Sequence, residues 1–362
     1  MGFFVTFKKV TYQIIGAINL VVVCIMCLMG YAGHFNTISH PTLELLSLAF
    51  PFPLLVNLLF LLFWLIFNVR YAVIPLVGML LCFSPIRAYC PINLKHDVPE
   101  GSLKVLSFNV HNYYFEKNGT YNAAEYVIKS DADIVCLQET NPRGRNNTEK
   151  VHEYLLRTYP YGMVNKKQGG ERMAFYSKFP ILWHEDLQVE SKHNMCTAYC
   201  IKIQEDSVLV VNCHLESIGL VSKEKEEFRE FVERKNKTID KKSLAHKLMA
   251  AGVIRARQMQ SVARYIRKHP GMSVILCGDF NDSPNSRANY IIGKQLNNCY
   301  TSTGNGLGFT YKSNFMYFRI DNIYCSDDFK PYRCLVDSKI NASDHSPVIC
   351  WMKKTAKVQK NQ

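Results

Sequence analysis

Two long stretches near the start of the chain contain no charged residue. The first lies between Lys9 and Glu44, and the second between Glu44 and Arg70. Each exceeds the ~20 residues that an α-helix needs to cross a bilayer, so transmembrane helices are predicted at about 11–33 and 45–67. A cleaved signal peptide is the competing interpretation of the first stretch, but its apolar run is long and a second span follows directly.

A third apolar run, at about 71–87, completes a predicted membrane region over residues 1–90. A helix of this length covers ~24 Å at ~1.5 Å per residue, less than a ~30 Å hydrocarbon core. It crosses only if the flanking arginines extend toward the headgroups. Lys8, Lys9 and Arg70, against a first loop without Lys or Arg, place the N-terminus in the cytoplasm. Three spans predict a multi-pass protein with the rest of the chain outside the cytoplasm, whereas two would keep it inside.

From residue 102 to 352 the pattern changes to short strand-like runs, several of them separated by helical stretches. The strand-like runs are LKVLSFNV, DIVCLQE, RMAFYS, SVLVVNCHLE, SVILCGDF, RIDNIYC and SPVICWM. No Pro- or Gly-rich linker, repeat or low-complexity block divides these residues, which predicts one domain. The alternation predicts an α/β fold, with a mixed sheet architecture covered by helices on its outer faces. The basic tail, residues 353–362, is predicted to be disordered.

Charge and cysteine usage add two observations. The formal net charge is +13, and residues 219–270 alone hold 14 Lys/Arg against 6 Asp/Glu, a local excess of +8. Such a segment suits a phosphate-bearing polymer or an anionic membrane surface, although a solvated helix of mixed charge is the simpler explanation. Ten of the 13 cysteines follow Arg87 without metal-site spacing, and those in strand-like runs are predicted to be buried free thiols. So many thiols weigh mildly against export.

Polar residues stand at the ends of the strand-like runs. They are Asn109, Glu139, His214, Asp279 with Asn281, Asp321, and Asp344 with His345. Any one of them is explained as a turn residue. Together, if the strand ends align on one rim, they predict a single cleft of carboxylates, amides and imidazoles. Oxygen ligands without thiolates suit a hard cation, Mg²⁺ or Mn²⁺.

The ordered series SFNV, LQET, NCHLES, GDFNDSP, RIDNI and SDHSP resembles the endonuclease/exonuclease/phosphatase superfamily. The resemblance covers nearly all of residues 102–352. It implies a four-layered α/β sandwich, two packed mixed β-sheets flanked by helices, here preceded by transmembrane helices. The three-span leader is similar to that of membrane-tethered bacterial members.

The resemblance also implies a role for each residue. Glu139 would be the principal metal ligand, with Asn109 and Asp344 beside it. Asp279 would orient or deprotonate the attacking water, and Asn281 would stabilise the developing phosphate charge. Asp321 would hold the tautomer of His345, and His214 would contact the scissile phosphate. Either Asp279 or His345 would be the general base.

A long predicted helix, from Leu244 to Arg267, carries an interrupted apolar stripe. At 100° per residue, Arg255 and Gln258 fall on the face that Leu248, Ala251 and Val262 share. An arginine extending from the edge of the stripe is one interpretation. The other is that Arg255 and Gln258 are buried and brace the loop that holds Asp279.

The sequence therefore predicts a membrane-anchored, metal-dependent phosphoesterase, most simply a phosphodiesterase that uses in-line attack of water. The substrate stays open between nucleic acid, favoured by the basic segment, and a phospholipid headgroup or inositol phosphate, favoured by the membrane tether. A membrane-anchored binding protein that keeps the fold without turnover is the alternative of another class. The oligomeric state is not predicted.

Overall fold

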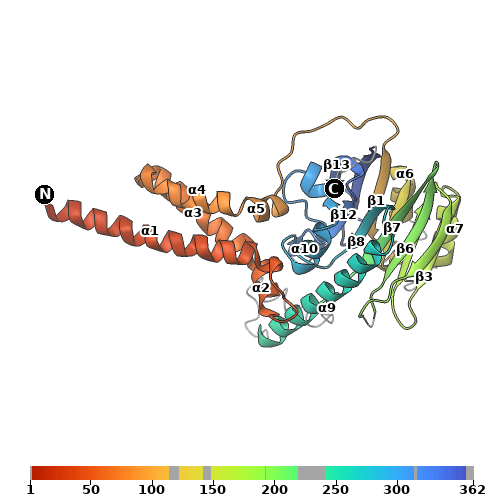
Figure 1. Cartoon of the computed structure of the whole chain (residues 1–362), viewed down its shortest axis with the longest axis horizontal. Helices are drawn as coiled ribbons and strands as arrows, with labels where there is room; N and C mark the ends of the chain where they lie inside the picture. Colours follow the sequence, from red (N-terminus) through yellow and green to blue (C-terminus); the bar gives the residue numbers. More distant parts are fainter. Residues whose placement is uncertain are drawn as a thin grey trace.

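The computed structural model describes residues 2–113, 122–141, 148–191, 193–218, 241–313 and 316–355. Figure 1 shows a helical region that projects from a unit built on two β-sheets. Residues 219–240 of the basic segment and residues 356–362 of the predicted disordered tail lie outside the described residues.

The helical region comprises residues 2–89. Its helices are α1 (Gly2–Gly30), η1 (Ala32–His34), α2 (Thr42–Ala49), α3 (Pro51–Phe67), η2 (Val69–Ala72), α4 (Val73–Leu81) and α5 (Phe83–Tyr89). Within α1, Thr6–Gly30 is long and apolar enough to cross a membrane. The predicted spans at 45–67 and 71–87 are each a bent pair of helices, with bends of 40° and 68°. Pro51 and Pro85 lie just after these bends, where a missing N–H interrupts the helix ladder.

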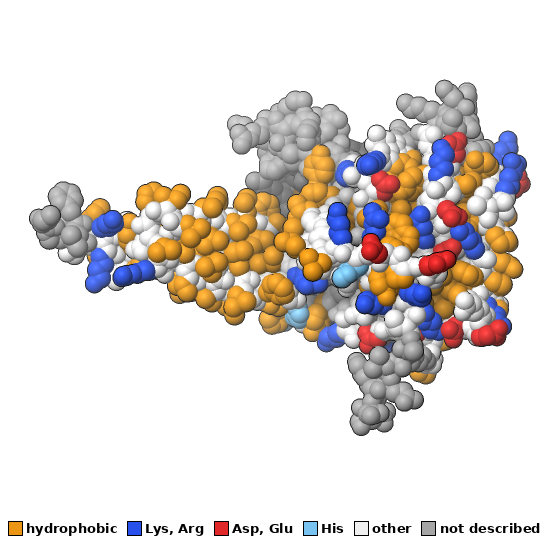
Figure 2. Space-filling view, turned by 90° about the horizontal axis from the view of Figure 1, so that it is seen from above, with side chains coloured by type: hydrophobic (Ala, Val, Ile, Leu, Met, Phe, Trp, Pro, Cys, Tyr) orange, Lys and Arg blue, Asp and Glu red, His pale blue; other side chains and the backbone are white. Residues whose placement is uncertain are grey.

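The helical region is apolar outside, and its interior holds both an apolar cluster and buried amides. Figure 2 shows a surface of hydrophobic side chains, with Lys and Arg gathered at the end remote from the sheets. Leu59 and Ile66 of α3 are 57% and 75% exposed. Inside, Asn19 Nδ2 donates to Asn57 Oδ1, and Trp64 Nε1 donates to Asn19 Oδ1, both at 3.1 Å. These three side chains are fully buried and tie α1 to α3.

The first sheet contains six strands in the order β13-β14-β1-β2-β4-β3. They are β13 (Phe329–Val336), β14 (Val348–Lys354), β1 (Leu103–Asn109), β2 (Ile134–Gln138), β4 (Arg172–Ser177) and β3 (Tyr161–Lys166). β1 and β2 pair in parallel and the other pairs are antiparallel, so the sheet is mixed.

The second sheet has the order β5-β6-β7-β8-β12-β9. Its strands are β5 (Ile181–Asp186), β6 (Cys196–Ile203), β7 (Asp206–His214), β8 (Ser273–Asp279), β12 (Asp321–Cys325) and β9 (Asn297–Asn298). Here β7 and β8 form the parallel pair. A separate hairpin joins β10 (Tyr311–Ser313) to β11 (Met316–Phe318).

The two sheets pack face to face and helices cover their outer faces, which confirms the predicted four-layered sandwich. The central strands are apolar on both faces because both faces are covered, as in β8, where every residue is buried. α6 (Asn122–Ser130) and α7 (Thr148–Leu156) lie on the first sheet. α9 (Lys241–Arg267) and α10 (Arg287–Gly293) cover the second. The short helices η3 (His111–Tyr113) and α11 (Cys299–Thr303) complete the fold.

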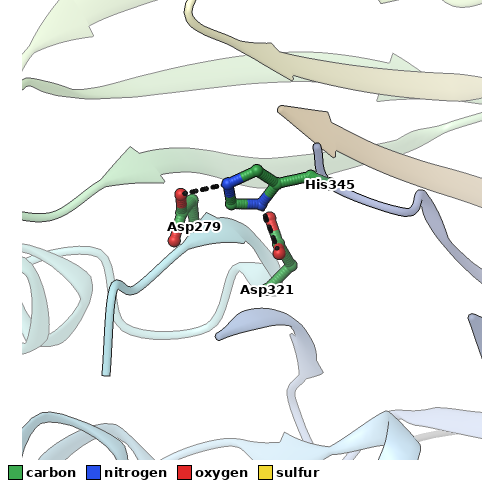
Figure 3. Close-up of side chains that lie close together, drawn as sticks. All are labelled: Asp279, Asp321 and His345. Carbon is green, nitrogen blue, oxygen red and sulfur yellow. Dashed lines mark hydrogen bonds and ion pairs between the residues drawn. The ribbon is translucent and has the colours of Figure 1, made fainter. Parts of the chain in front are cut away.

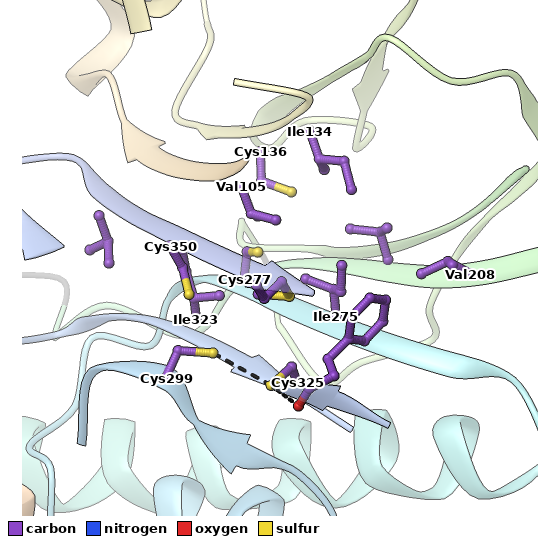
Figure 4. Close-up of a cluster of buried hydrophobic side chains, with 14 of the residues drawn as sticks. Val105, Ile134, Cys136, Val208, Ile275, Cys277, Cys299, Ile323, Cys325 and Cys350 are labelled. Atoms are coloured by element: carbon purple, nitrogen blue, oxygen red, sulfur yellow. Dashed lines mark hydrogen bonds between the residues drawn. The ribbon is translucent and has the colours of Figure 1, made fainter. Parts of the chain in front are cut away.

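The core between the sheets is rich in free cysteine. Figure 4 shows Cys136, Cys277, Cys299, Cys325 and Cys350 among Val, Ile and aromatic side chains. None of the 13 cysteines forms a disulfide, and those predicted in strand-like runs are buried. The prediction of buried free thiols is therefore confirmed.

The segment that follows α1 packs directly on the two-sheet unit. Arg287 Nη1 donates to Gly33 O at 3.3 Å and to His34 O at 3.0 Å. A Cβ at Gly33 would lie 2.3 Å from Asn285 O, so a larger residue would push the two segments apart.

α2 and α5 extend this junction. Glu44 of α2 is buried against α9, where a Cβ at Gly252 would lie 2.6 Å from Glu44 Cγ. At the end of α5, Arg319 donates to Ala88 O and, at 3.2 Å, to Tyr89 O. The segment after α1 and the last residues of α5 thus meet the same unit, at the same end of the helical region (Figure 1).

Candidate active site

The two parallel strand pairs bring the predicted polar residues to one edge of the sandwich. Asn109 at the end of β1 is in register with Gln138 at the end of β2, which Glu139 follows. In the other sheet, His214 at the end of β7 is in register with Asp279 at the end of β8. Asn109 Nδ2 joins the sheets, because it donates to Glu139 Oε1 and to Asp279 Oδ2, each at 3.0 Å.

Glycine permits the close approach of β7 and β8 beneath these residues. Gly278, which precedes Asp279, has φ 143°, and a Cβ there would lie 1.8 Å from Cys213 O. No other residue fits without moving β7. The glycine of the GDFNDSP motif therefore sets the spacing between His214 and Asp279.

Asp279 Oδ2 lies at the centre of the site. Besides the Asn109 amide, it faces His214 Nε2 at 3.6 Å and His345 Nε2 at 3.7 Å. Its other oxygen, Oδ1, accepts a hydrogen bond from Asn281 N at 2.8 Å. Asp279 is 1% exposed, so these nitrogens compensate a buried carboxylate.

His345 is held between two carboxylates (Figure 3). Its Nδ1 lies 2.9 Å from Oδ2 of Asp321, which opens β12 directly opposite Asp279. Burial alone would lower the pKa of His345, but the charges of Asp321 and Asp279 outweigh it and raise the pKa to about 10. Burial raises the pKa of Asp321, and His345 opposes that shift. The arrangement orients Nε2 toward Asp279.

His214 has a carboxylate partner that the sequence reasoning missed. Glu171 Oε1 lies 2.5 Å from His214 Nδ1 and accepts a hydrogen bond from Glu139 N at 2.9 Å. Burial opposes the charge on His214, but Glu171 and Asp279 raise its pKa to about 10. Glu171 stands just before β4, which runs antiparallel to β2 and so begins at the edge where β2 ends. An acidic residue before an antiparallel strand was the signal that could have found it.

Glu139 is the accessible carboxylate of the set, with 27% of its side chain exposed. Its Oε1 accepts from Asn109 and its Oε2 from Asn112 Nδ2 at 3.1 Å. The backbone of Glu139 has φ 52°, a left-handed conformation that is uncommon for glutamate. Asn112 and Asn281 share this conformation, with φ 54° and 52°. Such conformations cluster at functional sites, where surrounding contacts hold them.

Asp344 joins the site through His111. Asp344 Oδ1 lies 2.8 Å from His111 Nδ1, and His111 N donates to Asn109 Oδ1 at 3.0 Å. Ser343 also donates to Asn109 O at 2.7 Å, which ties the SDHSP segment to the end of β1. His111 and Asn112 were not predicted from the sequence.

Asn281 spans the loops that follow β7 and β8. Its Nδ2 donates to Leu215 O at 3.0 Å, while Leu215 N donates to Asp279 O at 2.9 Å. These bonds lock the residue after His214 to the residues around Asp279. The role of Asn281 as a donor to a phosphate oxygen stays a prediction.

Arg255 and Gln258 of α9 are buried, and together they contact the loops that follow β7 and β8. Arg255 Nε lies 3.1 Å from Asp282 Oδ2, and its Nη1 donates to Glu216 O at 3.3 Å. Gln258 Oε1 accepts from Glu216 N at 2.8 Å, and its Nε2 donates to Glu190 O. Arg255 is 4% exposed and Gln258 is fully buried, so neither extends from the edge of the stripe into solvent. Their contacts reach the loop after His214 as well as the loop after Asp279.

The donor set fits a hard divalent cation. Asp279, Asp321 and His345 each offer a ligand atom within 4.8 Å of the others, and all three are buried. In that group, the hydrogen bond between His345 Nδ1 and Asp321 Oδ2 already engages one possible metal-ligand atom of each residue. Glu139 offers carboxylate oxygens that are closer to solvent, beside the buried amide of Asn109, and Asp344 is connected to them through His111. Carboxylate and amide oxygens without a thiolate match Mg²⁺ or Mn²⁺.

Comparison with known families bears directly on this site. Residues 106–345, which include every candidate residue of the site, match the profile described as the endonuclease/exonuclease/phosphatase family. The chain belongs to this family. It is accordingly a hydrolase that acts on phosphate esters, and members of the family typically use a divalent metal. A second profile, described as a domain of unknown function, matches residues 12–89.

Solved structures share the fold at low identity. The human nocturnin catalytic domain, solved with a bound sulfate anion, is 15% identical with a TM-score of 0.51, and the match covers 73% of this chain and 96% of that one. An endonuclease/exonuclease/phosphatase from Bacteroides vulgatus is 16% identical with a TM-score of 0.51, over 70% of this chain and all of that one (100%). At such identities the likeness concerns the fold alone. No curated protein sequence matches the chain.

Proposed function

We propose that this chain is a membrane-anchored, divalent-metal-dependent phosphodiesterase, with a membrane unit at residues 1–90 and a catalytic unit at 102–352. The observation that carries the proposal is the convergence on Asp279 Oδ2 of one amide and two imidazole nitrogens, from the ends of β1 and β7 and from the segment before β14. A buried carboxylate surrounded in this way is suited to hold a water molecule in one orientation.

Glu139 and Asn109, with Asp344 beside them, would hold Mg²⁺ or Mn²⁺. When bound, the cation neutralises non-bridging phosphate oxygens and so lowers the barrier to attack. Asp279 and His345, 3.7 Å apart, act on the same attacking water, and Asp321 keeps the imidazole in place. His214, anchored by Glu171, donates to a phosphate oxygen, as does Asn281.

A phospholipid or another headgroup phosphate ester is the substrate class that the junction favours. The catalytic unit contacts the segment after α1 and the last residue of α5, so its site stays close to the end of the apolar helices. The part of the basic segment that favours nucleic acid, residues 219–240, lies outside the described residues. Nucleic acid therefore stands as the second candidate.

The distribution of Lys and Arg in the helical region favours a catalytic unit outside the cytoplasm, held by a multi-pass anchor. Lys8, Lys9 and Arg70 are the only Lys/Arg residues before Arg87, and basic side chains gather at the end of the helical region remote from the sheets (Figure 2). Cytoplasmic ends of spans carry the excess of Lys and Arg. The sheets lie at the opposite end of the helical region. Three membrane spans would place that end outside the cytoplasm.

A substrate panel on the intact chain in lipid nanodiscs tests the activity. We expect Mg²⁺-dependent hydrolysis of bis-p-nitrophenyl phosphate, lost in EDTA and restored by Mg²⁺ or Mn²⁺. Phospholipids, inositol phosphates, plasmid DNA and RNA then rank the substrate classes. Hydrolysis at an equal rate in EDTA, or no turnover of any phosphodiester, would overturn the proposal.

A reporter fused after Gln362 tests the orientation. Alkaline phosphatase, which is active only outside the cytoplasm, should be active in this fusion, and green fluorescent protein should not fluoresce after export through the Sec pathway. The reverse pair of results would mean that residues 71–87 do not cross the bilayer.

A further inference from the structure

A concave pocket of about 400 Å³ lies between α9 and α10, away from the site described above. Four of its lining side chains are cationic: Arg264, Arg267, Arg287 and Lys294. Among the described residues, no carboxylate lines it, and none of the four cations takes part in an ion pair. None of the lining residues belongs to the proposed catalytic set.

The positive charge at this pocket is only weakly compensated. Lys294 Nζ and the Arg287 guanidinium lie over the same ring, that of Tyr290, at 4.6 and 5.2 Å from its centroid. Arg287 otherwise donates to two backbone carbonyls, and its Nε is buried without a hydrogen-bond partner. With the Gln295 amide turned so that both of its polar atoms find partners, its oxygen accepts from Arg267 Nη1 at 2.6 Å. The buried Glu44 lies close enough to interact with the charge of Arg287, whereas Arg264, Arg267 and Lys294 have no carboxylate partner among the described residues and leave a field that attracts an anion.

His34 packs against Tyr290 and is affected by the same positive charges. Its ring lies 4.1 Å from the Tyr290 ring. The pKa of His34 is lowered by burial first, and Lys294 and Arg287 add to the effect by charge repulsion, against a backbone hydrogen bond that opposes it. A bound anion would relieve this repulsion.

The pocket stands beside the end of the apolar helix α1. Arg287 binds the carbonyls of Gly33 and His34, which follow α1 by three and four residues. If α1 crosses a bilayer, as the proposed function holds, this segment lies at the level of the lipid headgroups. The exposed ends of Arg264 and Lys294 then face anionic phosphate at that surface.

We propose that the pocket between α9 and α10 binds the phosphate group of an anionic lipid headgroup. The site would hold the catalytic unit against the membrane at a defined orientation, through a contact separate from catalysis. Phosphate diesters suit paired guanidinium and ammonium donors, which bind their oxygens by charge-assisted hydrogen bonds. The lipid source rests on the proposed membrane anchoring, whereas an anion site as such does not.

The intact chain in detergent, titrated with three probes, tests the proposal. The probes are dihexanoyl phosphatidylglycerol, dihexanoyl phosphatidylcholine and inorganic phosphate, and the measurement is the rise in melting temperature with concentration. We expect a saturable rise with phosphatidylglycerol, weakened by salt, and none with phosphatidylcholine. Inorganic phosphate giving the same rise at the same concentration would overturn the lipid as the source.

Two double variants locate the site. Arg264→Gln with Lys294→Gln removes two exposed cations of the pocket, and Arg257→Gln with Lys330→Gln removes two exposed cations elsewhere. We expect the first pair to weaken phosphatidylglycerol binding about tenfold or more, at ~1 kcal/mol per cation. The second pair should bind as the unchanged chain does. Equal weakening in both pairs, or in neither, would refute the pocket as the site.

Hydrolysis of bis-p-nitrophenyl phosphate by the same samples separates this proposal from the proposed function. Both double variants should keep the turnover of the unchanged chain, because none of the four residues touches the catalytic set. Normal hydrolysis without phosphatidylglycerol binding would refute only the pocket, and binding without hydrolysis would refute only the activity.

Discussion

The helical region and the sandwich differ most in the side chains that they leave exposed. Among the helices, Asn19 and Asn57 are fully buried, whereas Leu59 is 57% exposed. In the sandwich, apolar side chains fill three packed layers, and the buried polar groups gather at one edge around Asp279. An apolar exterior is favourable in an apolar solvent, so this difference supports the proposed membrane anchoring of the helical region.

The comparison also separates buried polar groups by what they do. Asn19 and Asn57 hydrogen-bond to each other and to neighbouring helices, which satisfies them fully. At the edge of the sandwich, Asp279 and Glu139 share the nitrogen neighbours Asn109 Nδ2 and His214 Nε2. The buried amides of the helical region stabilise helix packing. The buried charged groups at the site lower the stability of the folded chain and serve catalysis. Substitutions of the two groups should therefore differ in their effects on turnover and on stability.

The largest effect is expected at Glu139. Glu139→Gln keeps the volume and removes the ligand charge, so turnover should fall roughly 10⁴-fold, as the loss of several kcal/mol of charge stabilisation implies. The melting temperature should stay near that of the unchanged chain, because 27% of the side chain is already exposed. Steady-state kinetics with Mg²⁺ titration checks this, and a variant that retains full turnover would remove Glu139 from the proposed metal site.

Asp279→Asn and His345→Ala should each lower turnover roughly 10²–10⁴-fold. Because the two side chains face each other at 3.7 Å and act on one water, the double variant should be little worse than the poorer single variant. Rates measured for the two singles and the double decide the point. Losses that multiply would show that the two residues serve separate steps.

Arg255→Ala should destabilise the chain by roughly 3–5 kcal/mol, because it leaves Asp282 buried without its partner. Turnover should also fall as the loops after His214 and Asp279 loosen. Arg257→Ala, on the same helix, breaks an exposed pair with Glu190 and should cost no more than ~1 kcal/mol. Denaturant unfolding of both variants in detergent gives the comparison, and equal midpoints would rule out the bracing role.

Leu59→Asp and Leu182→Asp compare the surfaces of the two regions. Both leucines are about half exposed, at 57% and 50%. If α3 faces lipid, the first change should oppose membrane insertion by roughly 3 kcal/mol, while the second, on the edge strand β5, should alter stability by no more than ~0.5 kcal/mol. Membrane fractionation measures the first and thermal unfolding the second. Normal insertion of Leu59→Asp would mean that this surface faces water or protein.

The smallest effect is expected inside the helical region. Asn57→Leu breaks the bonds to Asn19 and to Pro75 O, which should cost ~1 kcal/mol of helix association. Turnover should not change, since Asn57 has no contact with the site. Unfolding in mixed micelles, with hydrolysis measured alongside, checks both parts, and a large loss of turnover would link the helix interior to catalysis.

Motif residues at strand ends were recognisable from the sequence because each follows or precedes an apolar run. Asn109, His214 and Asp279 lie at the ends of β1, β7 and β8, as the pattern indicated. The strands β3, β5, β6, β9, β10, β11 and β13 were missed: β5 is a largely exposed edge strand and β9 has two residues, but β6 is mostly buried and was missed as well. Glu171 was missed with them, because its place at the site depends on the antiparallel pairing of β4 with β2.

The sequence by itself determined the class of fold, the apolar segments and the chemistry of the site, because hydrophobic periodicity and motif residues are local properties of the chain. Tertiary structure alone decided which atoms meet: Asn109 with Asp279 across two sheets, Glu171 with His214, and Arg255 with Asp282. It also placed the segment after α1 against α10 and created the basic pocket beside it. These contacts join residues far apart in the chain, and their partners are selected by packing and register, which no local pattern encodes.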